Sequence, residues 1–266
     1  MPQTYKFQLF SDLHLEYCKD FPKIKPITDD LFLAGDIGNL SSILFEQFIT
    51  YCSNNWKKVF IILGNHEYYK TKKNMLKSLY EVNVDYINFF SKYNNVHLLD
   101  NSEYKLSNGL IIAGSTLWSN PLATEDNLDF RQALYDKLRI SVEEFSKLHN
   151  DSVVFLKNAI NKHKKILIMT HFPPTQVNTS NPLWNNQEQY MKDYYAAEIL
   201  SKFNNNNNNY SCFGINTKIK AWLFGHTHHS TNMVIDNINL ISNQLGYNNE
   251  SIISNFNSNG VIEIII

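Results

Sequence analysis

Short apolar runs recur along the chain, and each one stops at a polar residue. Five of them have the length of a strand and are nearly continuous in apolar residues, namely 5–10, 30–34, 59–63, 166–169 and 221–224. A strand that is buried on both faces of a sheet has this unbroken pattern. Three other segments repeat their apolar residues at helical spacing, namely 41–56, 71–93 and 141–162. Strands that alternate with helices predict an α/β fold.

Polar residues follow directly after each of these predicted strands. Ligands of open α/β sheets bind beyond the carboxyl ends of the strands, so the five ends predict one shared site. The later segments 231–242 and 261–266 follow one another without a clear helix. They predict an added antiparallel part, and with it two sheets packed together. Because no internal repeat or second domain is evident, residues 1–266 are interpreted as one domain.

The composition narrows the class of protein. The chain has 266 residues, of which 43% are hydrophobic and 18% charged, and its formal net charge is -1. Such a balance does not indicate a surface for polyanions, so nucleic acid is disfavoured as a partner. The three widely spaced cysteines are interpreted as free thiols in a reducing compartment. Since the chain has no signal-peptide run and no apolar stretch of about 18 residues, we expect a cytoplasmic protein without a membrane partner.

The polar residues after the strands form five short motifs. They are Asp12-Leu13-His14, Gly35-Asp36, Gly64-Asn65-His66-Glu67, the lone His171, and Gly225-His226-Thr227-His228. Residues two apart on an extended chain project to the same side, which pairs Asp12 with His14 and His226 with His228. Imidazole combined with carboxylate and amide oxygens suits divalent Mn, Fe, Zn or Ni. The sequence therefore predicts a metal site at the carboxyl ends of the strands.

The order of these motifs resembles that of the calcineurin-like metallophosphoesterase superfamily. The resemblance covers residues 12–228, most of the chain. It implies a four-layer αββα sandwich with two packed mixed β-sheets and a dinuclear metal site at the carboxyl ends of the strands. By this resemblance, the ligands of one divalent cation would be Asp12, His14, Asp36 and His228. The ligands of the other would be Asp36, Asn65, His171 and His226, so that Asp36 bridges the two cations.

The resemblance also implies a reaction, the hydrolysis of a phosphate ester. Two divalent cations about 3.5–4 Å apart can bridge and deprotonate one water, and the resulting hydroxide attacks phosphorus. Asn65 and His66 would contact the substrate, and His66 would protonate the leaving-group oxygen or stabilise its charge. We therefore expect a hydrolase that acts on a small phosphomonoester or phosphodiester.

One position departs from the family pattern. Many phosphatases of the superfamily have an Asp three residues after the bridging Asp, where it orients the catalytic His. In this chain the position is Asn39, which carries no charge. Either Glu67 or another group must orient His66, or His66 is less basic than usual.

Two other functions occur on the same fold. A nuclease of the superfamily would favour a basic channel or an appended nucleic-acid domain. The near-neutral charge of this chain and the lack of an evident appended domain disfavour a nuclease. A non-catalytic scaffold, such as the retromer subunit that resembles the superfamily, has a degraded metal site. Here all seven ligand positions and His66 hold competent residues. The sequence leaves open the substrate, the native metals and the oligomeric state.

The segment 172–195 is the candidate for substrate selection because it begins directly after His171. Pro173 and Pro174 cannot continue a strand or a helix, so the chain should leave the sheet beside the metal ligands. The segment then carries four large aromatic residues, Trp184, Tyr190, Tyr194 and Tyr195. They could cover the substrate as a lid or only pack onto the body of the protein, and both interpretations stay open at this point.

Overall fold

The computed structural model describes residues 3–120, 133, 135–184, 186–187, 189–200, 218–247, 250 and 254–266. The strands form two mixed sheets. The first sheet has the order β11-β1-β2-β3-β4 and consists of β1 (Thr4–Phe10), β2 (Asp30–Ala34), β3 (Lys58–Ile62), β4 (Val96–Leu98) and β11 (Ile262–Ile265). The second has the order β5-β6-β7-β8-β10-β9 and consists of β5 (Ser102–Lys105), β6 (Ile111–Ser115), β7 (Ile166–Thr170), β8 (Ile219–Phe224), β9 (Asn232–Ile235) and β10 (Ile238–Ser242).

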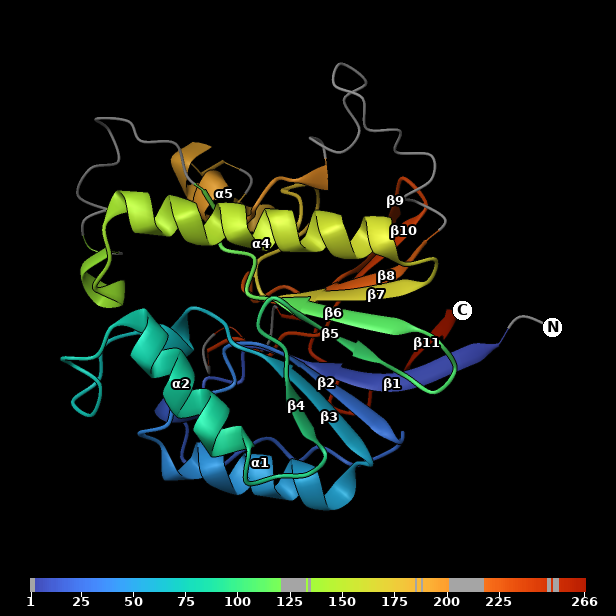
Figure 1. Ribbon diagram of the computed structural model, residues 1–266, viewed down its shortest axis with the longest axis horizontal. Helices are drawn as coiled ribbons and strands as arrows, with labels where there is room; N and C mark the ends of the chain where they lie inside the picture. The colour runs from blue at the N-terminus through green and yellow to red at the C-terminus, as the bar shows by residue number, and fades with distance from the viewer. Residues whose placement is uncertain are drawn as a thin grey trace.

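The helices cover the outer faces of these sheets. They are α1 (Ile43–Asn55), α2 (Leu79–Phe90), α4 (Val142–Lys162) and the short α5 (Gln189–Tyr195). Figure 1 shows α1 and α2 on the outer side of the first sheet and α4 across the outer side of the second, with the two sheets facing each other between them. This arrangement confirms the predicted four-layer αββα sandwich.

Both faces of the central strands are buried, which explains their unbroken apolar runs. On β2, Leu31 and Leu33 belong to the core under α1 and α2, whereas Phe32 belongs to the core between the sheets. The ring of Phe32 lies 4.7 Å from that of Phe7 on β1 and 5.0 Å from that of Phe60 on β3. All five side chains are fully buried. Replacing one such Phe by Ala would cost about 3–5 kcal/mol of stability, because the surrounding structure closes the cavity only in part.

Helix α2 begins later than the apolar spacing of residues 71–93 predicted. The Ser78 hydroxyl accepts a hydrogen bond from the Glu81 N–H, and the Glu81 carboxylate accepts one from the Ser78 N–H. This capping box satisfies N–H groups that have no partner within the helix, so Ser78 ends the preceding turns and starts the helix. The other two predicted helices, 41–56 and 141–162, agree with α1 and α4 within two residues at each end.

The late strands add antiparallel pairs, as expected, but they do not form one part. Strand β9 pairs antiparallel with β10, but β10 pairs parallel with β8 of the second sheet. Strand β11 joins the first sheet instead, antiparallel to β1, and its Ile264 packs in the core between the sheets. The late strands therefore extend both sheets, and β1 to β4 and β6 to β8 already define them.

Two further observations concern the sequence-based expectations. Among the described residues, no helix is both long enough and apolar enough to span a membrane. Cys18 and Cys52 are free thiols, whereas Cys212 lies outside the described residues.

Candidate metal centre

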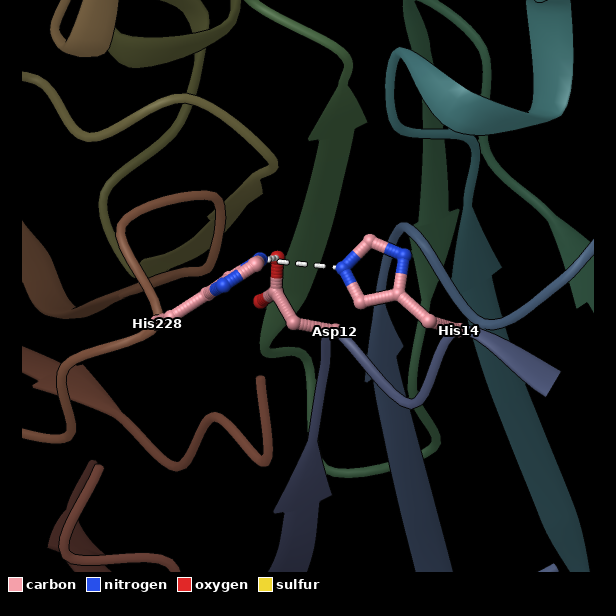
Figure 2. Close-up of side chains that lie close together, drawn as sticks. All are labelled: Asp12, His14 and His228. Carbon is pink, nitrogen blue, oxygen red and sulfur yellow. Dashed lines mark hydrogen bonds and ion pairs between the residues drawn. The ribbon is translucent and has the colours of Figure 1, made fainter. Parts of the chain in front are cut away.

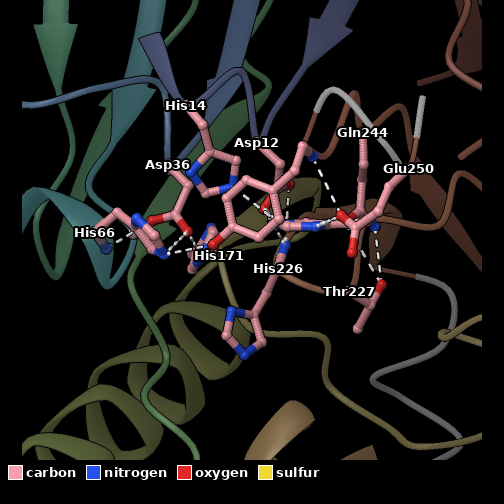
Figure 3. A network of polar contacts seen from close by, with 12 residues as sticks. Asp12, His14, Asp36, His66, His171, His226, Thr227, Gln244 and Glu250 are labelled. Atoms are coloured by element: carbon pink, nitrogen blue, oxygen red, sulfur yellow. Dashed lines mark hydrogen bonds and ion pairs between the residues drawn. The ribbon is translucent and has the colours of Figure 1, made fainter. Parts of the chain in front are cut away.

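The predicted site residues lie in loops that follow five strands of the two sheets. Asp12 and His14 follow β1, Asp36 follows β2, Asn65 and His66 follow β3, His171 follows β7, and His226 and His228 follow β8. The structure brings all of them together, and Figure 3 shows six of them, namely Asp12, His14, Asp36, His66, His171 and His226. Six of the seven predicted ligands are buried, and His228 is partly buried.

The backbone at these positions is strained in a consistent way. Five of the seven predicted ligands have positive φ angles between 47° and 76°, namely Asp12, His14, Asp36, His226 and His228. Such angles are uncommon for residues other than glycine and persist where the surrounding structure enforces them. Here hydrogen bonds between the loops do so, from Asp12 N–H to the Gly35 carbonyl and from His14 N–H to the Asp36 carbonyl, both at 3.0 Å. The loops thus keep an unfavourable backbone conformation, which directs these side chains toward one another.

One group of candidate ligands consists of Asp12, His14 and His228 (Figure 2). His14 Nε2 lies 2.9 Å from His228 Nε2, and His228 Nε2 lies 3.6 Å from Asp12 Oδ1. One ligand atom from each residue falls within 4.8 Å of the other two. Two imidazole nitrogens and a carboxylate oxygen that converge in this way are a suitable donor set for a divalent transition metal.

A second group consists of Asp36, His171 and His226, with Asn65 beside it. His171 Nε2 lies 3.4 Å from Asp36 Oδ2 and 3.0 Å from Asn65 Oδ1. The other ring nitrogen, His171 Nδ1, lies 2.9 Å from the Ala34 carbonyl and donates to it, which leaves Nε2 free to bind a cation. His226 Nε2 is buried without a hydrogen-bond partner among the described residues. A buried polar atom left unpaired costs about 1–3 kcal/mol, so a cation at this place would satisfy an otherwise unfavourable group.

The protonation states of Asp36 and His226 suit a metal site, whereas Asp36 outweighs the effect of burial on His171 and raises the pKa of His171 to about 9. Burial would raise the pKa of Asp36, but His171 and His66 more than offset this effect and hold the pKa well below its usual value. Burial, and then repulsion from His171, lowers the pKa of His226 well below its usual value. An ionised carboxylate and a neutral imidazole are the forms that bind a metal.

Asp36 connects the two groups of ligands. A carboxylate oxygen of Asp36 lies within 4.8 Å of ligand atoms of His171 and His226 on one side, and of His14 and His66 on the other (Figure 3). The same carboxylate accepts a hydrogen bond from the His66 N–H at 2.8 Å through Oδ1. The residue predicted to bridge two cations therefore occupies the central position.

Glu67 does not orient His66, which settles one alternative left open by the sequence. Its carboxylate is buried and accepts four backbone hydrogen bonds, from the N–H groups of Asp36, Ile37, Gly38 and Gly64 at 2.7–3.2 Å. Glu67 thereby ties the loop after β2 to the loop after β3. Its role is to fix the position of Asp36.

Glu16 is the carboxylate that holds His66. His66 Nδ1 donates to Glu16 Oε1 at 3.0 Å, which turns the other ring nitrogen toward the cavity. Asn39 instead accepts a hydrogen bond from the Ser41 N–H at 3.0 Å and shapes the turn before α1. Burial would lower the pKa of His66, but Asp36 and Glu16 together raise it above the usual value. The motif search missed Glu16, although the alternation Asp12-x-His14-x-Glu16 would have indicated it.

The segment after β10 contributes two further residues that the motifs did not indicate. The Tyr247 hydroxyl lies 3.1 Å from His66 Nε2. Glu250 Oε2 lies 2.5 Å from His228 Nδ1 and accepts its hydrogen, so that His228 Nε2 faces the other ligands. Nothing in the local sequence marks either residue, since both act on partners that the fold brings to them.

A cavity of about 680 Å³ opens beside the metal centre. Asp36, Asn65 and His66 line it, together with Trp184, Tyr194 and Tyr195 of segment 172–195. The rings of Trp184 and Tyr195 are stacked, with centroids 5.8 Å apart, whereas Tyr194 is buried against Phe172 and His226. Among the described residues, Tyr190 does not line this cavity. The segment therefore both packs onto the body of the protein and walls the cavity.

Comparisons with known proteins agree with this geometry. The family model named Metallophos, calcineurin-like phosphoesterase, matches residues 5–230. The chain is 31% identical to Uncharacterized protein L509 of Acanthamoeba polyphaga mimivirus over 282 residues, which cover 96% of this chain and 95% of that one. The crystal structure of phosphopantetheinyl hydrolase from Mycobacterium tuberculosis superposes with a TM-score of 0.64 at 14% identity, covering 92% of this chain and 90% of the other. At that identity the superposition shows a shared fold alone.

Proposed function

This chain belongs to the calcineurin-like phosphoesterase family, and from that premise we propose that it hydrolyses a phosphomonoester or phosphodiester of a small organic alcohol with two divalent cations. The observation that carries the proposal is the pair of neighbouring ligand groups, Asp12, His14 and His228 in one and Asp36, His171 and His226 in the other, with Asp36 also close to His14. Each group places its ligand atoms within 4.8 Å of one another. A structural zinc site, by contrast, would be a single closed set of four ligands.

The residues present fit the two cations that the family implies. Asp12, His14, Asp36 and His228 would hold one of them, and Asp36, Asn65, His171 and His226 the other. When bound, the cations would make a water acidic enough to attack phosphorus and would stabilise charge on the phosphoryl oxygens. The ligand set includes four histidines and one amide, so its own negative charge is small and the loaded centre would stay positive. The donor types suit Mn, Fe, Zn or Ni.

His66 is placed to donate the proton that the leaving group needs. Glu16 accepts the hydrogen of Nδ1 and stabilises the protonated ring, while Nε2 faces the cavity. As the bond between phosphorus and the leaving oxygen breaks, the Nε2 proton would pass to that oxygen. The Tyr247 hydroxyl lies 3.1 Å from Nε2. It stands where the leaving oxygen of a bound substrate would lie.

A series of esters with different leaving groups tests this function. Metal-loaded protein is expected to hydrolyse both alkyl and nitrophenyl esters, and His66→Asn should lower kcat about 10²–10⁴-fold for the alkyl esters. Nitrophenyl esters should lose much less, because nitrophenolate leaves without a proton. Equal losses on both kinds of ester would exclude acid catalysis by His66. If protein with two bound cations hydrolyses no monoester or diester at all, the proposed function is wrong.

A further inference from the structure

The cavity beside the metal centre has two separate aromatic walls. One consists of Tyr17 and Tyr247, whose ring centroids are 6.0 Å apart, and the Tyr17 ring lies 6.1 Å from His66. The other consists of the stacked rings of Trp184 and Tyr195, and Tyr195 lies 5.8 Å from His226. Among the described residues, no ring contact joins one pair to the other. The two walls therefore flank different histidines of the site, His66 on one side and His226 on the other.

Only one of these walls can hold the leaving group. Under the proposed function, on which this inference rests, His66 protonates the leaving oxygen, so the departing alcohol lies on the His66 side against Tyr17 and Tyr247. The wall of Trp184 and Tyr195 then faces another substituent of phosphorus. In a monoester that substituent is a charged oxygen, and in a diester it is a second organic group.

The chemistry of the second wall favours an organic group. The two hydroxyls near this wall already have partners, since Asn65 Nδ2 donates to the Tyr69 hydroxyl at 2.8 Å and the Tyr69 and Tyr194 hydroxyls lie 3.3 Å apart. The lysines that line the cavity are exposed, and Lys137 Nζ lies over the Tyr69 ring, 5.4 Å from its centroid. A flat ring would find two aromatic faces there, whereas a charged oxygen gains little from contact with such faces.

Space continues beyond the stacked pair. A second cavity of about 380 Å³ shares Trp184 and Tyr195 with the first, and neutral polar residues line most of it, among them Gln176, Thr179 and Gln187. A group held against Trp184 and Tyr195 could therefore extend into a polar, mostly uncharged pocket.

From these observations we propose that the substrate is a phosphodiester whose retained arm carries a planar ring stacked on Trp184 and Tyr195. Its departing alcohol lies on the His66 side, against Tyr17 and Tyr247. In the reaction, the oxygen of a water bonds to phosphorus, the bond from phosphorus to the departing oxygen breaks, and the proton of His66 Nε2 passes to that oxygen. The proton released by the attacking water restores His66 through solvent. The products are an alcohol and a phosphomonoester that keeps the planar arm.

Three esters with the same leaving group test this proposal. They are p-nitrophenyl phosphate, methyl p-nitrophenyl phosphate and phenyl p-nitrophenyl phosphate, which differ only in the retained arm. We expect the phenyl diester to have the highest kcat/KM, about tenfold above the methyl diester, which is the order of magnitude of one stacked ring. Trp184→Ala should bring this phenyl-to-methyl ratio close to one. Leu183→Ala is the matched control, because Leu183 adjoins Trp184, is 78% exposed and lines neither cavity, and it should leave the ratio unchanged.

A binding measurement gives a readout that does not need turnover. Phenylphosphonate and methylphosphonate cannot be hydrolysed at their P–C bonds, so their dissociation constants from metal-loaded protein can be compared by calorimetry. Wild type should bind phenylphosphonate about tenfold more tightly, and Trp184→Ala should bind both alike.

Different failures have different meanings. A monoester hydrolysed faster than both diesters, or ratios that respond equally to Trp184→Ala and Leu183→Ala, would overturn the diester proposal while the proposed function stands. Absence of any hydrolysis would overturn the proposed function. In that case the phosphonate pair still decides whether the wall of Trp184 and Tyr195 binds a planar group, and equal affinities in wild type would contradict it.

Discussion

Asp36 occupies a place where neighbouring atoms leave almost no room. A Cβ on Gly64 would clash with Asp36 Oδ1, and a Cβ on Gly35 would lie 2.5 Å from His171 Nδ1. Both contacts are shorter than real Cβ atoms allow, so these motif glycines are required by close packing around the carboxylate. Gly35 also has a φ of +86°, which further favours glycine. The motif glycines thus make room for the ligands beside them.

The central position of Asp36 gives a prediction about metal content. Asp36→Asn removes the one carboxylate assigned to both cations, so bound metal should fall from two per chain to one or fewer. His66→Asn should keep nearly the full content, since His66 is assigned to the leaving group. Elemental analysis of both variants after reconstitution decides between these roles. A clear loss of metal in His66→Asn would mean that His66 is a ligand.

A second prediction concerns Glu16, which holds His66 through Nδ1. Glu16→Gln keeps the shape of the side chain but removes the charge that stabilises a protonated His66, so kcat for alkyl esters should fall about 10–100-fold. Nitrophenyl esters and metal content should change little. Asn39→Ala is the control, because Asn39 makes a local turn instead of contacting His66. If Asn39→Ala reduced alkyl-ester hydrolysis as much as Glu16→Gln, the orienting role would belong to Asn39.

The sequence indicated the residues that converge at the candidate centre better than the residues that support them. The ligands stand in short motifs directly after apolar strands, and both signals are local. The partners of His66 and His228 are set by distant parts of the chain, since Glu16 is 50 positions and Tyr247 is 181 positions away from His66. The alternation Asp12-x-His14-x-Glu16 places Glu16 near the site, but no periodicity or motif encodes such pairings. They become visible only once the loops after β1, β3 and β10 are placed together.

At the level of elements, burial explains which predictions succeeded. Strands β2, β3 and β7 lie between other strands and between two cores, so their unbroken apolar runs identified them. The start of α2 was placed too early because apolar spacing alone does not show where a capping box ends the preceding turns. The pairing of β10 and β11 with different sheets was also missed, since strand partners far apart in sequence leave no local pattern.

The segment after β10 gives a prediction at this scale. Glu250 fixes the tautomer of His228, and carboxylates that hold a ligand histidine commonly contribute 10–100-fold to metal affinity. Glu250→Ala should therefore weaken the metal by about that factor. A more exposed carboxylate away from the site, Glu263 on β11, pairs only with Lys6 among the described residues, and Glu263→Ala should leave affinity unchanged. Equal effects of the two substitutions in a competitive chelator titration would remove the special role of Glu250.

At the level of the whole molecule, the candidate centre lies where the two sheets meet. The loops of the first sheet supply Asp12, His14, Asp36 and Asn65, and the loops of the second supply His171, His226 and His228. Neither sheet alone carries the ligands of either cation. Because only the folded protein would bind the cations, their binding should stabilise the packing of the two sheets.

The central claim is that this fold holds two catalytic cations, and metal reconstitution measured together with activity tests it most directly. Protein stripped by chelation should lose hydrolysis of its best diester or monoester. Returning Mn, Fe, Zn or Ni should restore activity as the content approaches two ions per chain, with a rise in Tm. Full hydrolysis by protein shown by elemental analysis to be free of metal would contradict the account.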